Sequence, residues 1–318
     1  MKLSIKNAFQ GAVLILTSNS IAAFASTEQD MQSHCENISL QVLGSGGPEI
    51  NDGLASASFL LWIDGKARVM VDAGGGSSLN FEKARADFND LKAILLTHLH
   101  VDHSAALPVY IKAGYFTGRS TALPVFGPAS GGDFPATEDF IYALFNDRPP
   151  GVYAYLSDNI RQQASTDFLI EPQSVEPSGD IWRHQLTADI ALSAINVVHG
   201  PVPALAWRVS YKGCSVSFSG DMNGRSGNLQ KLAENTDLLV ANNAIAQQAG
   251  RIAKNLHMTP QTIGKIASVA KVRKLALSHF MLRSRDKKSE SVDIIKQNYE
   301  GEIILTDDLG IITFQGTP

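Results

Sequence analysis

Four strong metal ligands within six positions constrain this chain more than any other feature. The segment Thr97-His98-Leu99-His100-Val101-Asp102-His103 directly follows the apolar run Ala93-Ile94-Leu95-Leu96. A lone histidine is usually a buried, hydrogen-bonded structural residue, but a cluster of imidazoles and a carboxylate gains little from burial unless a cation organises it. The segment therefore predicts a buried strand that ends at a metal site.

Length and composition are those of an ordinary globular protein. The chain has 318 residues, of which 44% are hydrophobic and 18% charged, and it shows no linker and no shift in composition. Its net charge is −4 and it contains no run of Lys or Arg, which argues against a long nucleic acid as partner. We expect one domain over residues 26–318.

The first 25 residues have the pattern of a secretory signal peptide. Lys2 and Lys6 precede an apolar segment at 11–16, and Ala23-Phe24-Ala25 resembles a small-residue cleavage site. That segment is too short to span a membrane, and no later stretch approaches 18 consecutive apolar residues. We expect cleavage near Ala25 and a periplasmic or secreted mature protein without a membrane span.

The mature chain keeps two cysteines, Cys35 and Cys214. In an oxidising compartment they could pair and join the first strand to a later hairpin. The alternative, which we favour on sequence, is two separate buried thiols. Neither lies in the Cys-x-Pro-x-Arg context that formylglycine-type sulfatases need.

Hydrophobic patterning alternates strands with helices along the chain. A helix is expected from the spacing at 81–88, a second around 107–111, a third near 229–233 and a fourth after Thr259-Pro260, an N-cap followed by proline. The expected strands cover 38–43, 58–63, 67–71, 93–96, 123–127, 190–199, 204–211, 214–218, 237–241, 272–277, 302–305 and 310–314. Aromatic residues concentrated between Phe134 and Tyr155 are expected mostly in the core, with some forming an apolar wall over the site.

Several acidic and histidine side chains follow strand ends, where open sheets present functional groups. Asp72 and Asp221 each follow a β-hairpin and lie beside glycine, which hints that the two halves repeat one layout. Asp72 is suited to orient a metal-binding histidine. One metal would be held by His98, His100 and His199, and a second by Asp102, His103 and His279, with Asp221 bridging. Two divalent ions about 3.5–4 Å apart can share a hydroxide and polarise an ester.

The motif His98-x-His100-x-Asp102-His103, with His199, Asp221 and His279 downstream, resembles the metallo-β-lactamase superfamily. The resemblance covers nearly all of the mature chain and implies an α/β fold, an αββα sandwich of two mixed sheets flanked by helices with a di-metal, usually di-zinc, site. The segment Leu43-Gly44-Ser45-Gly46-Gly47-Pro48 together with His257 and Ser278-His279 is most similar to the ribonuclease Z-like branch. That similarity gives His257 a catalytic role, in leaving-group assistance or transition-state stabilisation; otherwise His257 is a polar residue before a helix cap.

The sequence departs from ribonuclease Z in two places. Only 21 residues separate His199 from Asp221, where ribonuclease Z carries a tRNA-gripping arm. The stretch Val240-Ala241-Asn242-Asn243-Ala244 also lacks the His-Glu pair that the tRNA enzymes show there. We therefore expect a small anionic ester as substrate and no nucleic acid polymer. True β-lactamases of this superfamily lack an aspartate matching Asp221. Glyoxalase II adds a C-terminal helical domain, whereas strands are expected here to the end.

The resulting expectation is a periplasmic hydrolase with two Zn²⁺ per chain, other divalent transition metals being compatible. Asp102 and His257 are the expected catalytic residues. The aromatic region favours an arylsulfatase; the alternative is a phosphodiesterase acting on a cyclic nucleotide or another small phosphodiester. A non-catalytic metal-binding protein is the least favoured reading, and a homodimer is left open.

Overall fold

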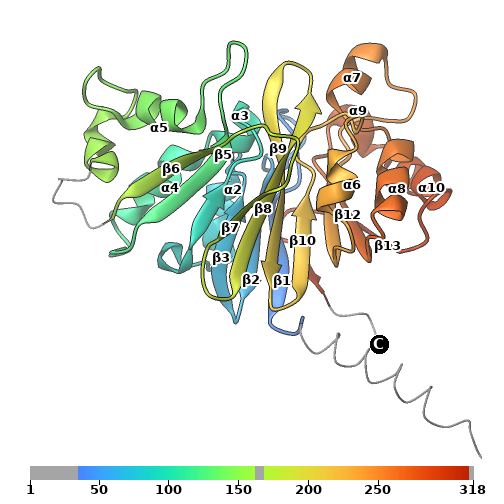
Figure 1. Ribbon diagram of the computed structural model, residues 1–318, viewed down its shortest axis with the longest axis horizontal. Coiled ribbons are helices and arrows are strands. Elements are labelled where there is room, and N and C mark those ends of the chain that lie inside the picture. Colours follow the sequence, from blue (N-terminus) through green and yellow to red (C-terminus); the bar gives the residue numbers. More distant parts are fainter. Residues whose placement is uncertain (1–34, 162–167, 315–318) are drawn as a thin grey trace, which may run out of the picture.

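The computed structural model describes residues 35–161 and 168–314 and is built around two mixed β-sheets packed face to face (Figure 1). The predicted signal peptide lies outside the described residues. The first sheet has the strand order β14-β1-β2-β3-β4-β5-β6, antiparallel from β14 to β3 and parallel from β3 to β6. Its strands are β1 (Ile38–Gly44), β2 (Ser58–Ile63), β3 (Lys66–Val71), β4 (Ala93–Leu95), β5 (Leu123–Pro128), β6 (Ile170–Val175) and β14 (Ile311–Thr313).

The second sheet repeats this layout. Its order is β13-β12-β11-β10-β9-β8-β7, parallel from β13 to β10 and antiparallel from β10 to β7. Its strands are β7 (Trp182–Gln185), β8 (Ile190–His199), β9 (Val202–Tyr211), β10 (Cys214–Phe218), β11 (Leu238–Asn242), β12 (Lys274–Ser278) and β13 (Glu302–Leu305). β3 and β10 therefore correspond, each closing an antiparallel meander and beginning a parallel series.

Helices cover the outer face of each sheet (Figure 1). On the first sheet and its edge lie α2 (Ser77–Lys83), η1 (Phe88–Asp90), α3 (Val101–Ser104), α4 (Leu107–Gly114), α5 (Thr137–Phe145) and η2 (Ala154–Ile160). On the second lie α6 (Asn228–Leu232), α7 (Arg251–Leu256), α8 (Pro260–Val269), α9 (Leu282–Arg285) and α10 (Lys288–Lys296). No helix in the described ranges is long and apolar enough to span a bilayer.

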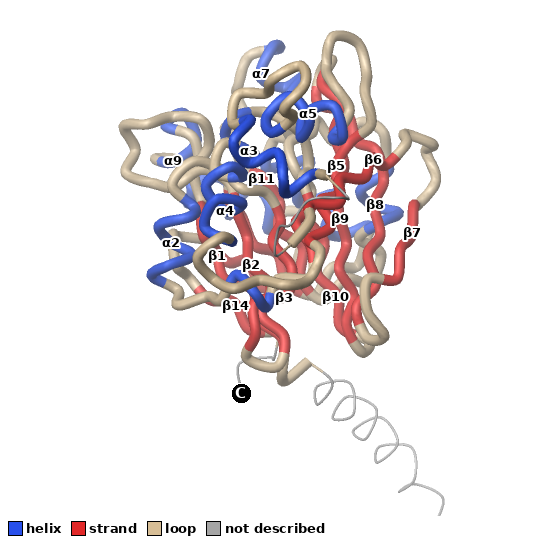
Figure 2. The backbone as a smooth tube through the Cα atoms, turned by 90° about the vertical axis from the view of Figure 1, so that its left-hand side faces the viewer, coloured by secondary structure: helices blue, strands red, loops and turns tan. Residues whose placement is uncertain are grey.

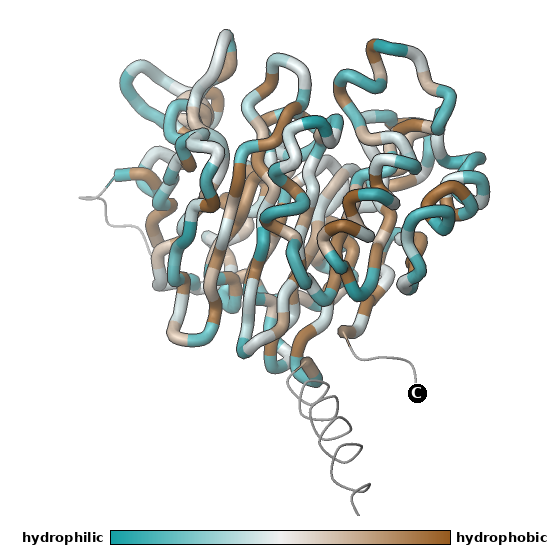
Figure 3. The backbone as a smooth tube through the Cα atoms, turned by 45° about the vertical axis from the view of Figure 1, so that its right-hand side comes forward, coloured by the Kyte–Doolittle hydropathy of each residue, from teal (hydrophilic) through white to brown (hydrophobic). Residues whose placement is uncertain are grey.

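Three hydrophobic clusters account for this layering. One lies between the sheets and includes Leu61, Val71, Trp207 and Val240. The second packs the first sheet against α2 and α4, and the third packs the second sheet against α6, α8 and α10. Brown and white stretches run along the strands of the sandwich in Figure 3, while teal is frequent in the surrounding loops. The expected αββα sandwich is confirmed.

The predicted elements agree best where burial is strongest. Strands β1, β2, β3 and β10 match the predicted ranges within one residue, and α8 begins after Thr259, whose side chain accepts a hydrogen bond from Thr262 N. The helix expected over 81–88 is wrong in position. Helix α2 ends at Lys83, and Arg85 has a φ of 56°, a left-handed conformation that no helix interior contains.

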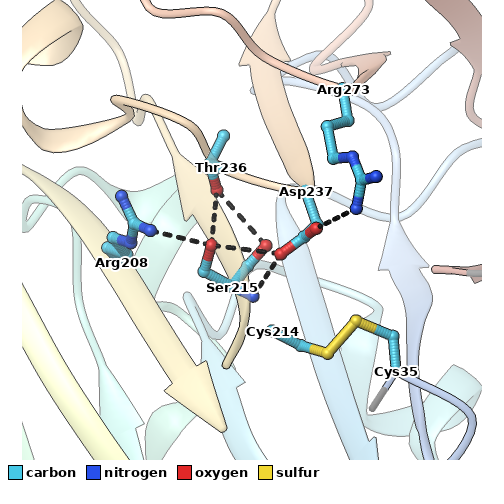
Figure 4. The surroundings of a disulfide bond; sticks show 7 residues. All are labelled: Cys35, Arg208, Cys214, Ser215, Thr236, Asp237 and Arg273. Atoms are coloured by element: carbon cyan, nitrogen blue, oxygen red, sulfur yellow. Dashed lines mark hydrogen bonds and ion pairs between the residues drawn. A yellow bond between two sulfur atoms is a disulfide. The ribbon is translucent and has the colours of Figure 1, made fainter. Parts of the chain in front are cut away.

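Cys35 and Cys214 form a disulfide (Figure 4), so the favoured expectation of two separate thiols is wrong. Their Cα atoms are 5.7 Å apart, within the usual range for a disulfide. Cys35 precedes β1 and Cys214 begins β10, so the bond joins the two sheets. It lies at the end of β10 opposite to Asp221.

Candidate metal centre

The predicted site residues all lie at one edge of the sandwich. β4 ends at Leu95, and the following loop and α3 supply the cluster that begins at His98. The other positions are the last residue of β8, the turns after β10 and β12, and the C-cap of α7. Figures 1 and 2 show α3 and α7 at this same edge. Segments more than 170 residues apart in sequence thus meet where their strands end.

The first predicted ligand set is assembled. One nitrogen from each of His98, His100 and His199 lies within 4.8 Å of the other two. His98 is fully buried, and its Nε2 has no hydrogen-bond partner among the described residues. His199 Nδ1 donates to the carbonyl oxygen of Leu256 at 2.9 Å, which leaves Nε2 as the lone-pair nitrogen facing the cluster.

The second predicted set is assembled beside it. His279 Nε2 lies 3.2 Å from Asp102 Oδ2 and 3.2 Å from His103 Nε2. These three residues again form a group whose ligand atoms lie within 4.8 Å of one another. Two imidazole nitrogens and a carboxylate oxygen therefore converge on one point.

Asp221 lies between the two sets. Its Oδ2 is 3.8 Å from His103 Nε2 and 3.7 Å from His199 Nε2, and its Oδ1 is 3.5 Å from His279 Nε2. Asn242 Nδ2 donates to Oδ1 at 2.8 Å and so fixes the carboxylate. Asp221 is placed to serve both sets.

His257 completes the cluster from the side of α7. Its Nδ1 lies 3.7 Å from Asp221 Oδ2 and has no hydrogen-bond partner in the described part of the chain. Burial lowers the pKa of His257 to about 4, although the charge of the neighbouring Asp221 opposes this shift. In the metal-free cluster His257 is therefore a neutral imidazole at pH 7.

Asp72 and Thr97 form the base of the cluster. Asp72 accepts hydrogen bonds from Thr97 N at 2.7 Å, from Thr97 Oγ1 at 2.8 Å and from His103 Nδ1 at 2.7 Å. His103 Nε2 is thereby turned toward Asp102 and His279. Asp72 thus occupies the orienting position expected from its place at the end of β3.

Two glycines allow the backbone to approach this cluster closely. Gly220 has a φ of 56°, and a Cβ there would lie 2.8 Å from Thr97 Cβ and 3.0 Å from Leu205 O. A Cβ on Gly47 would lie 3.0 Å from His279 Cε1. The Gly-rich loop after β1 is therefore part of the wall behind His279, as its expected place near the site mouth suggested.

Protonation in the metal-free cluster follows its charges. Burial alone would raise the pKa of Asp102, but the hydrogen bond from His279 and the charge of His103 lower it to about 2. Burial alone would lower the pKa of His103, but Asp72, through charge and hydrogen bonding, raises it to about 9. The pKa of Asp221 is also well below its usual value, because the surrounding histidines outweigh its burial. Two ionised carboxylates therefore share this pocket with protonated imidazole.

The donor set fits divalent transition metals such as zinc. Imidazole nitrogens and carboxylate oxygens are the ligands that such ions prefer. The buried Nε2 of His98 has no hydrogen-bond partner among the described residues and is free to bind an ion there. Clusters of histidine and aspartate able to bind metal are therefore present at this edge.

The aromatic region contributes little to the site. Phe134 lies beside it, with its ring centroid 6.3 Å from that of His100. Phe145, the last residue of α5, is fully buried in the core, and Phe140 packs against the same core. Of the expected aromatic wall, Phe134 is the ring in a recorded contact with a predicted metal ligand, His100.

The fold and this edge define the class of protein. A family model described as a beta-lactamase superfamily domain matches residues 67–280, and the chain belongs to that superfamily. Ribonuclease Z from Pseudomonas putida is 24% identical over 299 residues, covering 80% of this chain and 89% of its own.

Solved structures share the fold. The short form of human tRNase Z has a TM-score of 0.67 at 20% identity, covering 87% of this chain and 99% of its own. Zn²⁺-bound PqqB from Methylobacterium extorquens has a TM-score of 0.54 at 13% identity, covering 86% of this chain and 99% of its own. The chain is a metal-dependent ester hydrolase of this superfamily, and phosphodiester-like substrates fit its relatives better than the sulfate esters expected first.

The expectation that excluded a nucleic acid polymer is wrong. The similar curated proteins are ribonucleases Z, whose substrate is RNA. Net charge misled here because it averages the whole surface, whereas a substrate meets only the surface around the site. Residues 238–285 contain no Asp or Glu and eight basic residues. Arg251 and Lys254 lie on α7 and Arg283 and Arg285 on α9, near the site, whereas Lys271, Arg273 and Lys274 lie at the other end of β12 and Lys265 lies on α8.

Sequence reasoning also missed three supports of the site. Thr97, Asn242 and the carbonyl of Leu256 hold Asp72, Asp221 and His199, respectively. The carbonyl of Leu256 leaves no signal in the sequence, because every residue has one.

The acid-free segment 238–285 was missed as well, although a count of acidic residues along the chain would have found it.

Proposed function

We propose that this protein is a phosphodiesterase that uses two divalent metal ions, zinc being the first choice. The observation that carries the proposal is the pair of adjacent ligand sets that share Asp221. The names of its ribonuclease Z relatives support a phosphate ester as substrate. The zinc in the PqqB structure supports the choice of metal.

Two bound ions would polarise a phosphate ester and activate a water molecule at neutral pH. The chain's own residues prepare the geometry for this chemistry. His98, His100 and His199 would hold one ion; Asp102, His103 and His279 would hold the other; Asp221 would serve both. Asp72 and Leu256 O orient two of these histidines before any metal arrives.

His257 is proposed to assist the leaving group. It lies beside Asp221, and its Nδ1 has no hydrogen-bond partner in the described ranges, so it is not held by the scaffold. A neutral imidazole has one N–H to donate, and a departing ester oxygen gains negative charge that such a donor stabilises. Asp102 contributes through its ionised carboxylate, whose pKa is about 2.

A sulfate ester is the second candidate substrate. Phe134 beside His100 is the observation in its favour, since an aromatic ring suits an aryl leaving group. The same ring suits a nucleobase equally well. Relatives named for cleavage of RNA therefore favour the phosphodiester.

We also propose that the mature protein begins after Ala25 and is exported. The disulfide between Cys35 and Cys214 supports an oxidising compartment. Mass spectrometry of the exported protein should find an N-terminus directly after Ala25. A protein that keeps residues 1–25 would contradict the proposal.

A substrate panel tests the enzymatic proposal. Zinc-loaded protein should cleave bis(4-nitrophenyl) phosphate at least about tenfold faster, in kcat/KM, than 4-nitrophenyl sulfate. A faster rate with the sulfate would reverse the order of the two candidates. No cleavage of either ester would contradict the proposed function.

A further inference from the structure

A pocket of about 450 Å³ opens beside the metal centre, on the side of α7. It is lined by Arg225, Arg251, Ile252, Asn255 and Leu256. Both arginines are exposed, and neither forms an ion pair with any described residue. None of the lining residues is acidic. The pocket is therefore a concave, positively charged surface without an internal counter-ion.

This pocket shares a wall with the catalytic edge. The carbonyl of Leu256 accepts the hydrogen bond from His199 Nδ1 at 2.9 Å, and His257 is the next residue. On the other side Asn223, two residues after Asp221, donates through Nδ2 to Asn255 O at 2.9 Å. The pocket therefore adjoins the segments that carry His199, Asp221 and His257.

Arg225 is held in position before a ligand arrives. Its Nη1 donates to Asn255 Oδ1 at 3.1 Å, and its Nη2 lies 3.4 Å from Lys254 O. Two of its five N–H groups are used in this way, and three stay available for an anion. Arg251 has no side-chain hydrogen bond to a described residue and supplies a second guanidinium from the other end of α7.

The chain segments that line the pocket contain basic residues and no acid. Residues 222–233 and 238–285 contain no acid, and Lys254 lies on α7 itself. Arg283 is near enough to His257 for its charge to act on that imidazole. Asp221 is the nearest acid along the chain, and its carboxylate is engaged by Asn242 and lies 3.7 Å from His257 in the metal centre.

We propose that Arg225 and Arg251 form a second phosphate subsite, which takes the neighbouring phosphate of an oligonucleotide whose scissile phosphate lies at the metal centre. Planar guanidinium groups match phosphate oxygens bidentately. A volume of 450 Å³ exceeds what one phosphate needs and leaves room for a sugar against Ile252, whose side chain is 80% exposed. This inference rests on the proposed phosphodiesterase function and adds that the preferred substrate carries at least two phosphates.

Matched substrates and matched variants test the subsite. The substrates are a dinucleoside monophosphate and the same compound with an added 5′ or 3′ phosphate. The pocket variant is Arg225→Gln/Arg251→Gln. The control is Lys231→Gln/Lys265→Gln, which removes the same charge from exposed positions on α6 and α8 outside the pocket.

In the wild type, one of the two added phosphates should raise kcat/KM at least about tenfold, mainly through KM. The pocket variant should lose that gain, and the control should keep it. The plot of log kcat/KM against log salt should become shallower by about 0.7 in the pocket variant, because the subsite contacts one phosphate and each phosphate contact to a single strand contributes about 0.7.

Arg225 also braces α7, so Arg251→Gln alone is measured as a second variant. Equilibrium binding of a fluorescein-labelled trinucleotide to the metal-free protein gives a readout without turnover, and both variants should bind it more weakly than the control does. The subsite would be overturned if the pocket variant and the control lost the same share of the gain in kcat/KM, or if neither added phosphate raised kcat/KM in the wild type. Either result would leave the proposed phosphodiesterase function standing. Failure of the wild type to cleave any diester would instead overturn the proposed function and this inference together.

Discussion

Asp72 binds three groups at the base of the metal centre at once. It accepts from the backbone and hydroxyl of Thr97 and from His103 Nδ1, and it is almost fully buried. These bonds fix the ring of His103 so that Nε2 faces Asp102 and His279. Acceptors of this kind orient metal ligands and raise their basicity.

Asp72→Asn should therefore weaken metal binding at the His103 set about 10- to 100-fold. The amide keeps one acceptor oxygen but loses the charge and adds an N–H where acceptors are needed. Competition with a chromogenic chelator measures the affinity. Asp180→Asn, at an exposed turn, serves as the control; an affinity unchanged by Asp72→Asn would contradict the orienting role.

Metal binding should also depend on pH through His103. Its pKa of about 9 in the metal-free protein means that it carries a proton at pH 7, which a metal must displace. The pKa of His279 is also raised, by Asp221 and by the hydrogen bond to Asp102, so apparent affinity should rise at least about tenfold per pH unit between pH 7 and 9 and level off above. Asp102 does not contribute to this slope, since it is already ionised. Calorimetry in buffers of different ionisation enthalpy counts the released proton, and a flat profile would contradict the assignment.

His257 differs from the other histidines in its expected role. His257→Ala should keep the full metal content but lose about 10²- to 10⁴-fold in kcat with a poor leaving group, because leaving-group assistance matters most there. The loss should shrink with 4-nitrophenolate, which leaves without help. A variant that binds less metal would instead make His257 a ligand.

At the scale of elements, the disulfide joins the two sheets at the end of β10 that lies opposite to the metal centre. Cys214 begins β10, and the chain beyond it is held by Asp237, which accepts from Ser215 N at 2.9 Å and contacts Arg273 Nη1 at 3.2 Å (Figure 4). This end of β10 is therefore anchored twice, once covalently and once by charge.

Cys35→Ser/Cys214→Ser should lower the free energy of unfolding by about 2–5 kcal/mol, since removing a native cross-link frees the unfolded chain. Urea unfolding of the metal-free protein measures this. Metal affinity should not change, because the metal ligands lie at the opposite end of the sheets. A loss of metal binding without a loss of stability would contradict this separation.

Buried strands could be predicted because their side chains repeat a simple pattern. β2 and β10 are buried along nearly their whole length, so continuous apolar runs marked them. Edge strands β6 and β7 have mixed burial and went unpredicted. Helix α2 was misplaced because Arg85 takes a left-handed turn, a conformation for which its sequence gives no sign.

At the scale of the whole molecule, the centre lies where two similar halves meet. β1 to β6 and β8 to β13 follow the same course, and Asp72 and Asp221 follow corresponding strands β3 and β10. In one half this aspartate orients a histidine, and in the other it lies between the two ligand sets. The similarity of layout suggested by the sequence is thus present in the fold.

The residues of the centre could be predicted from the sequence because they are chemically rare and follow strand ends. Their supports could not, since Asn242 and Leu256 have ordinary identities and act only through position. Net charge misled for a different reason: acids elsewhere in the chain conceal the acid-free segment 238–285, which includes α7 beside the centre.

The central claim is a two-metal phosphodiester hydrolase, and metal content measured together with turnover tests it most directly. Zinc-loaded wild type should hold two ions per chain and cleave bis(4-nitrophenyl) phosphate, with activity lost on chelation and restored by zinc. His98→Ala should hold at most one tightly bound ion and lose at least about a hundredfold in kcat. Full activity of His98→Ala, or of the chelated wild type, would contradict the account.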